Sequence, residues 1–230
     1  MLPLHVEVVL FDGFDLLDVT APYEVFQYGA DVTGGALTVR LVSAEGPRDV
    51  PSGAGPTLRA EAALDPVRAD VVVVPGAYGP VDDPEETGRD TIPVLLARTL
   101  DTRLPQLVAQ ALEDGTTTVA TVCGGSLALA MAGLLTGRHA VTHHLGMVVL
   151  EATGVRPVAA RVVDDGNLIS AGGVTSGLDL GLYLLERHLG ARVARAVEDM
   201  FEYERRGTVW RSGGVDPVAV PSPAATEDAA

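Results

Sequence analysis

The chain carries a single cysteine, and its surroundings suit a nucleophile. Cys123 follows a β-branched run that begins at Thr116, and a Gly-Gly pair and an apolar helical stretch come directly after it. This order of strand, turn and helix is typical of a nucleophile elbow, in which small neighbours let the backbone approach the reacting atom. The N-terminus of the helix would favour the thiolate, which is the form that attacks. A lone cysteine is otherwise most often an inert core residue, so both interpretations stay open.

A carboxyl group is a suitable proton carrier for such a nucleophile, and the first apolar run of the chain supplies candidates. Asp12, Asp15 and Asp18 follow residues 5–11. Held near the thiol in an apolar pocket, Asp18 would have a raised pKa and could exchange a proton with a substrate. The same position also suits the N-cap of a helix that begins near Pro22, and the residues alone favour that second interpretation.

Backbone donors for a developing negative charge are predicted at a third strand end. Gly76 and Ala77 follow the apolar run of residues 71–74, so the N–H of Ala77 could act together with that of Gly124. An ordinary Pro-Gly turn is the alternative. The acidic loop of residues 76–90 follows the same strand, and it either lines a site or is a solvated loop.

Metal chemistry is not indicated. One cysteine can form neither an internal disulfide nor a multi-thiolate metal site. His143 and His144 have no cysteine or carboxylate at ligand spacing, and we expect them to have a polar, hydrogen-bonded structural role. We therefore expect no metal and no organic cofactor.

The scaffold that must position these residues is predicted from alternating patterns. Apolar β-branched runs predict strands, and helical spacing lies between them. The predicted strands cover residues 5–11, 37–43, 71–74, 116–122 and 161–163, and the predicted helices cover residues 22–28, 104–113, 126–134, 177–188 and 192–205. Runs that are apolar on both faces suit a sheet covered by helices on both sides. The sequence thus predicts an α/β three-layer sandwich with a largely parallel sheet.

Composition limits the partners. Of the 230 residues, 47% are hydrophobic and 20% are charged, which is an ordinary composition for a folded protein. The net charge of -15 repels phosphates, which argues against nucleic acid or an anionic membrane as the partner. The start of the chain does not resemble a signal peptide, and glycines interrupt the apolar stretch of residues 119–135, so we expect a cytoplasmic protein. One domain is predicted over residues 1–211, followed by a mobile acidic, Pro/Ala-rich tail over residues 212–230.

Taken together, these motifs resemble the ThiJ/PfpI superfamily. The likeness is carried by residues 17–22 (LDVTAP), 74–77 (VPGA), 122–126 (VCGGS) with 132–135 (AGLL), 140–143 (AVTH), and 165–168 (DGNL) through 172–179 (GGVTSGLD). It extends from the first predicted strand to the penultimate predicted helix. The resemblance implies the flavodoxin-like fold of class I glutamine amidotransferases and a homodimer, for which the apolar residues 127–135 and 178–189 would supply surface.

Within the superfamily, the chain resembles isonitrile hydratases and the ligand-binding half of AraC-type transcription regulators. Phe201-Glu202-Tyr203 is similar to the hydratase pattern. The regulators carry an additional basic helix-turn-helix domain, and we expect none after Arg206. The enzyme branch is therefore favoured.

The resemblance implies a role for each candidate residue. It makes Cys123 the nucleophile and Asp18 the general acid/base, with the backbone at Gly76, Ala77 and Gly124 binding substrate or stabilising negative charge. The implied lyase reaction adds water to an isonitrile, and gives an N-substituted formamide through a thioimidate on the cysteine. Hydratases usually have Thr after the cysteine and peptidase-like members have His, whereas this chain has Gly124.

Two other classes of function remain open. The first is a small-molecule-binding or redox-sensing protein with a reactive cysteine. The second is a cofactor-free glyoxalase or amidase, which would direct the same nucleophile at a carbonyl.

Overall fold

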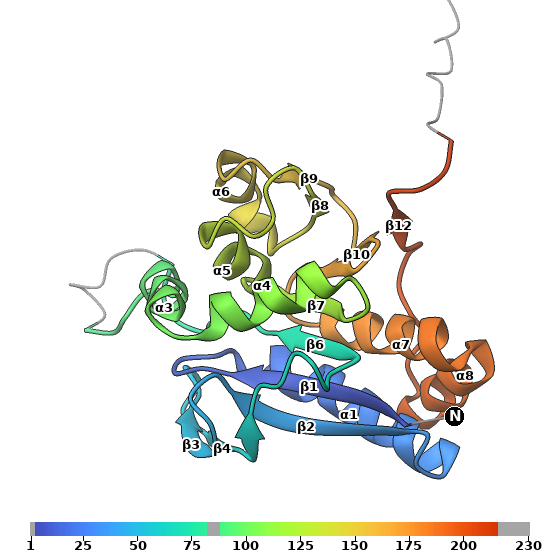
Figure 1. Ribbon diagram of the computed structural model, residues 1–230. Coiled ribbons are helices and arrows are strands. Elements are labelled where there is room, and N and C mark those ends of the chain that lie inside the picture. Colours follow the sequence, from blue (N-terminus) through green and yellow to red (C-terminus); the bar gives the residue numbers. More distant parts are fainter. Residues whose placement is uncertain (1–2, 82–87, 216–230) are drawn as a thin grey trace, which may run out of the picture.

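The computed structural model describes residues 3–81 and 88–215, and these residues form a layered α/β structure (Figure 1). The main sheet has eight strands in the order β12-β10-β11-β7-β6-β1-β2-β5. Its strands are β1 (Leu4–Leu10), β2 (Leu37–Ser43), β5 (Ala62–Ala63), β6 (Val71–Val74), β7 (Thr118–Val122), β10 (Val162–Asp165), β11 (Leu168–Ala171) and β12 (Trp210–Arg211). All pairs are parallel except β10 with β11. This topology confirms the predicted, largely parallel sheet.

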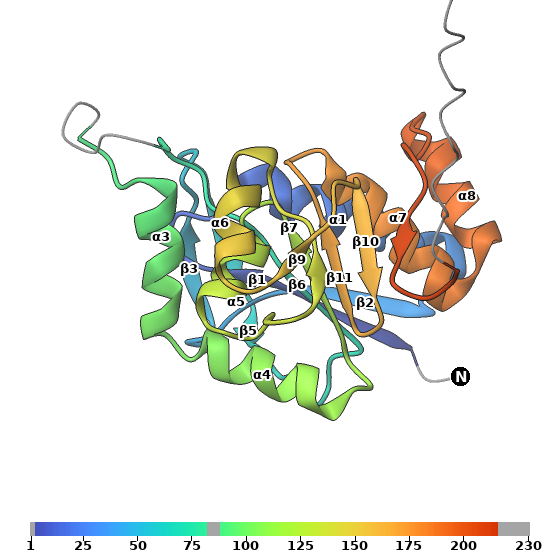
Figure 2. The same ribbon diagram turned by 90° about the horizontal axis from the view of Figure 1, so that it is seen from above.

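Helices cover both faces of the sheet. They are α1 (Leu16–Thr33), α3 (Ile92–Arg98), α4 (Leu104–Asp114), α5 (Gly125–Met131), α6 (Met147–Ala152), α7 (Ser176–Leu189) and α8 (Ala191–Phe201), with 3-10 turns η1 (Thr99–Asp101) and η2 (His144–Gly146). Figure 2 shows α1, α7 and α8 on one side of the sheet and α4 on the other. Two small two-stranded sheets pair β3 (Arg48–Pro51) with β4 (Thr57–Ala60) and β8 (His139–Ala140) with β9 (Arg156–Pro157).

Successive side chains of the central strands point to opposite faces of the sheet, and they contribute to two hydrophobic cores. In β6, Val71 and Val73 pack into the core beneath α1 and α7, whereas Val72 and Val74 pack into the core beneath α4. All four side chains are fully buried. A β-branched strand that is apolar on both faces suits this central position, because each face must be covered.

The first helix begins earlier than the sequence predicts. Helix α1 starts at Leu16 rather than at Pro22, because Asp15 is the N-cap and its carboxylate accepts the N–H of Leu17 at 2.9 Å. Pro22 therefore lies inside the helix, where it removes the N–H that would bond to the carbonyl of Asp18. The earlier start places Asp18 in the first turn of the helix.

The apolar stretches that were expected to offer dimer surface are partly core. Leu129, Leu180, Leu182 and Leu184 are at most 1% exposed, and burial in the two cores explains their apolar character. Met131 is 38% exposed, so the homodimer stays a prediction. No helix among residues 3–81 and 88–215 is long and apolar enough to cross a membrane.

The end of the described chain still contacts the sheet. β12 pairs with β10, and the N–H of Ser212 donates to the carbonyl of Asp164 at 3.0 Å. The start of the predicted tail is therefore tied to the body of the protein. Residues 216–230 of that tail lie outside the described residues.

Candidate active site

Cys123 lies at the turn between β7 and α5, as the sequence predicts. Its φ angle is 53°, a left-handed conformation that is uncommon for a residue with a side chain. Its N–H donates to the carbonyls of Ala171 (3.0 Å) and Gly172 (2.9 Å), and its own carbonyl accepts the hydroxyl of Thr142 at 2.7 Å. Neighbouring strand ends thus hold the backbone in this conformation.

The two glycines after the cysteine differ in what they tolerate. A Cβ on Gly125 would lie 2.2 Å from the carbonyl oxygen of Val74, so no side chain fits there. Gly124 has a φ of -65°, which any residue adopts, and a Cβ there would lie 3.2 Å from Leu96 Cδ1. Close packing of helix on strand requires the second glycine but not the first.

Asp18 faces the thiol from the first turn of α1. Its side chain is fully buried, and the N–H of Gly76 donates to Oδ2 at 2.9 Å. Among the described residues, Oδ1 has no hydrogen-bond partner. Burial raises the pKa of Asp18 well above its ordinary value, with a further contribution from the charge of Asp15, while the Gly76 N–H and the Cys123 thiol act in the opposite direction. The helix-cap interpretation of Asp18 was wrong, because Asp15 is the cap.

The expected thiolate is not favoured by this environment. Burial, and then the nearby Asp18 carboxyl, raise the pKa of the Cys123 thiol to about 12, although the N–H groups of Gly124 and Val174 donate to the sulfur and lower it. Cys123 is only 8% exposed, so the loss of hydration outweighs these two donors. Negative charge is therefore unfavourable on either member of the Asp18–Cys123 pair.

Gly76 and Ala77 lie beside the pair, but they differ in how they can act. The N–H of Gly76 is used by Asp18, and a Cβ on Gly76 would lie 2.6 Å from the nitrogen of Gly124. Gly76 thus permits close backbone packing and holds the carboxyl, which differs from the oxyanion role expected for its N–H.

Ala77 keeps its N–H free of the surrounding backbone. It forms an antiparallel bridge with Phe14, through bonds from Asp15 N–H to Gly76 and from Tyr78 N–H to Gly13. This register leaves the N–H of Ala77 outside the bridge, and residues 3–81 and 88–215 offer it no acceptor. It is therefore available as a donor to a bound molecule.

Val174 is a site residue that the sequence analysis missed. It lies in the loop between β11 and α7, and its backbone N–H reaches the sulfur of Cys123. A backbone donor leaves no mark in its side-chain type. The only signal was the Gly172-Gly173 turn that follows a strand, and such a turn occurs at many strand ends.

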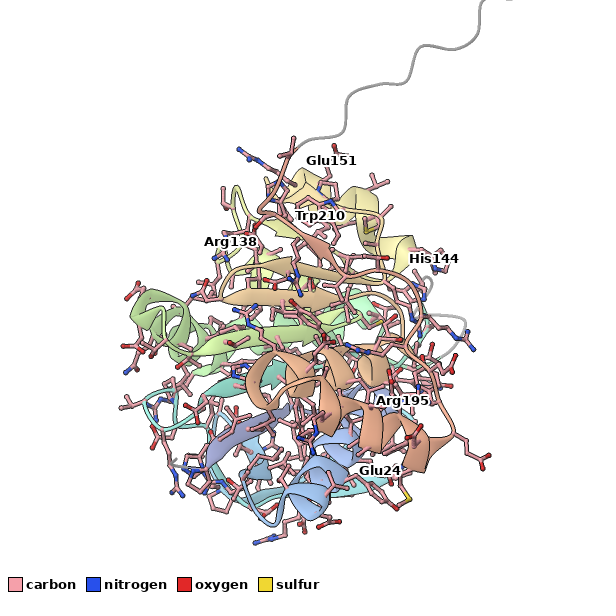
Figure 3. The ribbon with its side chains drawn as sticks, turned by 90° about the vertical axis from the view of Figure 1, so that its right-hand side faces the viewer. Glu24, Arg138, His144, Glu151, Arg195 and Trp210 are labelled. Carbon is pink, nitrogen blue, oxygen red and sulfur yellow. The ribbon has the colours of Figure 1, made fainter. Side chains whose placement is uncertain are left out.

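The two histidines have structural contacts. His143 accepts the N–H of Leu145 at 3.3 Å and so caps η2, and its ring lies 4.3 Å from that of His144, which Figure 3 labels at the surface. Burial and the neighbouring His144 lower the pKa of His143. Within the described part of the chain, no group of His, Cys, Asp and Glu side chains could hold a metal ion.

The acidic loop borders the site through its first two residues, Gly76 and Ala77. Tyr78 is 45% exposed, and the guanidinium of Arg89 lies 5.9 Å from the centre of its ring and donates to the carbonyl of Gly53 at 2.7 Å. Residues 82–87 of the loop lie outside the described residues. A cavity of about 720 Å³ lies elsewhere, lined by residues of α7, α8 and the segment before β12, and it includes neither Cys123 nor Asp18.

Comparison with known proteins relates this geometry to other chains. The model of the DJ-1/PfpI family matches residues 93–187. The chain is 34% identical over 204 residues to isonitrile hydratase of Pseudomonas putida, covering 87% of this chain and 78% of the hydratase. It is 27% identical over 207 residues to the HTH-type transcriptional regulator GbdR of Pseudomonas aeruginosa, of which it spans about half, 52%. A ThiJ/PfpI family protein from Pseudomonas syringae has a similar structure, with a TM-score of 0.72 and 26% identity over 90% of this chain and 78% of that one.

Proposed function

The chain belongs to the DJ-1/PfpI family, and we propose that it is an isonitrile hydratase-like lyase, which adds water to an isonitrile to give an N-substituted formamide. The observation that carries this proposal is the buried Asp18 carboxyl, which faces the Cys123 thiol with one oxygen unpartnered among the described residues. A proton held at that place suits a substrate that must gain a proton on the atom that the sulfur attacks.

In the first step, the sulfur of Cys123 forms a bond to the terminal carbon of R–NC. The protonated carboxyl of Asp18 gives its proton to the same carbon and takes up the proton of the thiol, which produces the thioimidate R–N=CH–S–Cys123. The pair begins and ends this step without net charge. This fits a buried site in which the pKa values of both groups are raised.

In the second step, water resolves the thioimidate. The carboxylic acid of Asp18 protonates the nitrogen while its other oxygen accepts a proton from water, and the hydroxyl adds to the carbon. The C–S bond of R–NH–CH(OH)–S–Cys123 then breaks, which releases R–NH–CHO and returns the proton to sulfur. The N–H groups of Gly124 and Val174 stabilise the departing thiolate.

The high pKa of the thiol bears on the alternative functions. Redox-sensing cysteines are accessible and have a low pKa, whereas Cys123 is buried and its pKa is raised to about 12. The free N–H of Ala77 instead supports a carbonyl-directed enzyme as the second candidate, because it could bind an oxyanion.

A turnover screen tests the proposal and separates it from the second candidate. Purified protein is incubated with alkyl isonitriles, methylglyoxal and simple amides, with Cys123→Ala and Asp18→Asn as controls. We expect formamide from the isonitriles in the unmodified protein and none in the Cys123→Ala variant. Turnover of methylglyoxal or amides without isonitrile hydration would replace the proposal by the carbonyl-directed one.

The expected setting of this activity is a cytoplasmic homodimer. Leu17, Tyr28 and Val32 are exposed, and their spacing places them on one face of α1, the helix that carries Asp18. These exposed apolar side chains, which share their helix face with the exposed Glu24, support a contact between two copies of the chain.

A further inference from the structure

The loop of residues 172–175, between β11 and α7, is joined to the cysteine from two sides. The N–H of Cys123 donates to the carbonyl of Gly172 at 2.9 Å, and the N–H of Val174 donates to the sulfur. The direction of the Val174 N–H depends on the conformation of this loop. Groups that fix the loop therefore position a donor on the sulfur.

Arg161 contacts this loop at both of its ends. Its carbonyl accepts the N–H of Gly172 at 3.0 Å, and its guanidinium donates to the hydroxyl of Thr175, also at 3.0 Å. The same guanidinium donates from Nε to the carboxylate of Asp179 at 2.5 Å. Since Asp179 lies in the first turn of α7, Arg161 ties the loop to the start of the helix that follows it.

The buried carboxylate of Asp179 accepts hydrogen bonds from three residues. It is 2% exposed, and besides Arg161 it accepts the hydroxyl of Tyr203 at 2.9 Å and the N–H of Arg206 at 2.7 Å. Tyr203 follows the C-terminus of α8, which is distant in sequence from the loop. Charge-assisted hydrogen bonds to a buried carboxylate are strong and geometrically specific, so these contacts make a rigid support.

We propose that Arg161, Asp179 and Tyr203, here called the Arg161 cluster, are positioning residues that hold the N–H of Val174 on the sulfur of Cys123. The cluster acts through the loop and touches neither the sulfur nor the substrate. The inference rests on Cys123 being the nucleophile of the proposed function, but it does not depend on which substrate the cysteine attacks.

Helix α7 supplies a matched control. Arg187 donates to Asp164 at 2.8 Å, and the hydroxyl of Tyr183 donates to the same carboxylate oxygen. This second cluster has the same three residue types and also joins α7 to a neighbouring element. Within the described residues, none of its hydrogen bonds reaches the loop of residues 172–175.

Neither cluster contains a group that itself acts on the sulfur. The titratable groups that affect the thiol are Asp18 on α1 and Asp15 at its N-cap, and the second backbone donor is Gly124. A change in the reactivity of the thiol in a cluster variant therefore reports on the Val174 donor.

The test is alkylation of the only cysteine by iodoacetamide, which forms an S–C bond and releases iodide and a proton. Rates are measured from neutral to alkaline pH in wild type, Arg161→Lys and Tyr203→Phe, with Arg187→Lys and Tyr183→Phe as controls.

Loss of the Val174 donor raises the pKa of the Cys123 thiol. We expect Arg161→Lys to be about tenfold slower at neutral pH, which corresponds to a pKa about one unit higher. Tyr203→Phe changes the rate in the same direction by less, and both controls keep the wild-type rate.

Thermal unfolding of each variant shows which of them are folded. If the controls slow alkylation as much as Arg161→Lys does, or if neither Arg161→Lys nor Tyr203→Phe slows it, the inference is wrong. If Arg161→Lys does not fold, the alkylation rate of Tyr203→Phe compared with that of Tyr183→Phe decides. A protein that fails to hydrate isonitriles but shows the expected alkylation pattern refutes the proposed function and supports the Arg161 cluster.

Discussion

Asp18 and Asp179 are both buried aspartates at the start of a helix on the same side of the sheet, but their surroundings are opposite. Asp18 faces one backbone N–H and a thiol, and its Oδ1 lacks a partner within the described residues. Asp179 accepts from Arg161, Tyr203 and the N–H of Arg206. Burial of a carboxyl is unfavourable unless donors compensate for the lost water, and only the second arrangement supplies donors to both carboxylate oxygens.

This difference separates a group that reacts from a group that supports. The unfavourable burial of Asp18 raises its pKa, so the carboxyl keeps its proton at pH values where an ordinary carboxyl has lost it. An acid/base residue requires such a proton. The donors around Asp179 fix its position, and through Arg161 they fix the loop that carries Val174. Substitutions at the two positions should therefore have different consequences.

The largest effect is expected for Asp18→Asn. The carboxamide keeps the shape but cannot exchange the proton, so kcat on an isonitrile should fall by about 10²–10⁴-fold. The free energy of unfolding should not fall, because a neutral amide replaces a carboxyl that is unfavourably buried. Steady-state kinetics and urea unfolding measure the two quantities. An unchanged kcat together with a loss of stability would show that Asp18 is only structural.

Asp179→Asn should show the reverse pattern. The substitution leaves the Arg161 guanidinium, which is 26% exposed, without its carboxylate, and we expect the free energy of unfolding to drop by about 1–3 kcal/mol. Alkylation of Cys123 should also slow. Asp164→Asn, which removes the carboxylate that accepts from Arg187 and Tyr183, is the matched control, and it should lower stability without affecting alkylation. Wild-type stability in Asp179→Asn would show that the donors around Asp179 do not stabilise its carboxylate.

The pH dependence of stability offers a sharper test of Asp18. Because its pKa is raised in the folded protein, the folded state keeps this proton at pH values where the unfolded chain has released it, so Asp18 lowers stability as the pH rises above about 4. Asp18→Asn lacks this contribution. The difference in stability between Asp18→Asn and wild type should therefore be absent in acid and should grow, in favour of the variant, toward neutral pH. Equal pH profiles in the two proteins, measured by urea unfolding below the pKa of the thiol, would refute a raised pKa for Asp18.

The smallest effect is expected for Gly124→Thr, which restores the residue usual in hydratases. The φ of -65° permits it. The added Cβ meets the movable end of Leu96 at 3.2 Å and the Cα of Gly76 at 3.4 Å, which is an ordinary van der Waals contact, so stability should change by no more than about 1 kcal/mol. Isonitrile turnover should be kept or raised if the protein is a hydratase. Gly125→Ala is the contrasting variant and should prevent folding, because its Cβ would overlap the carbonyl of Val74. Loss of turnover in a folded Gly124→Thr would count against hydration.

Features set by neighbouring residues in the chain could be predicted from the sequence. The turn at Cys123 is marked by a strand, two glycines and a helix in succession, and all three signals are local. The strands over residues 37–43 and 71–74 were predicted with their observed bounds, because β-branched apolar runs leave little choice of conformation. The family resemblance rested on the same kind of local motif.

Features set by the packing of distant segments could not be predicted. Asp15 and Asp18 are the same residue type three positions apart, and only the seating of α1 against the sheet makes one a cap and buries the other against Cys123. The reversal from an expected thiolate to a thiol with a raised pKa has the same origin, since dehydration depends on which residues surround the sulfur in space. The Val174 donor belongs to the backbone, which every residue shares, so only the tertiary structure could direct it at the cysteine.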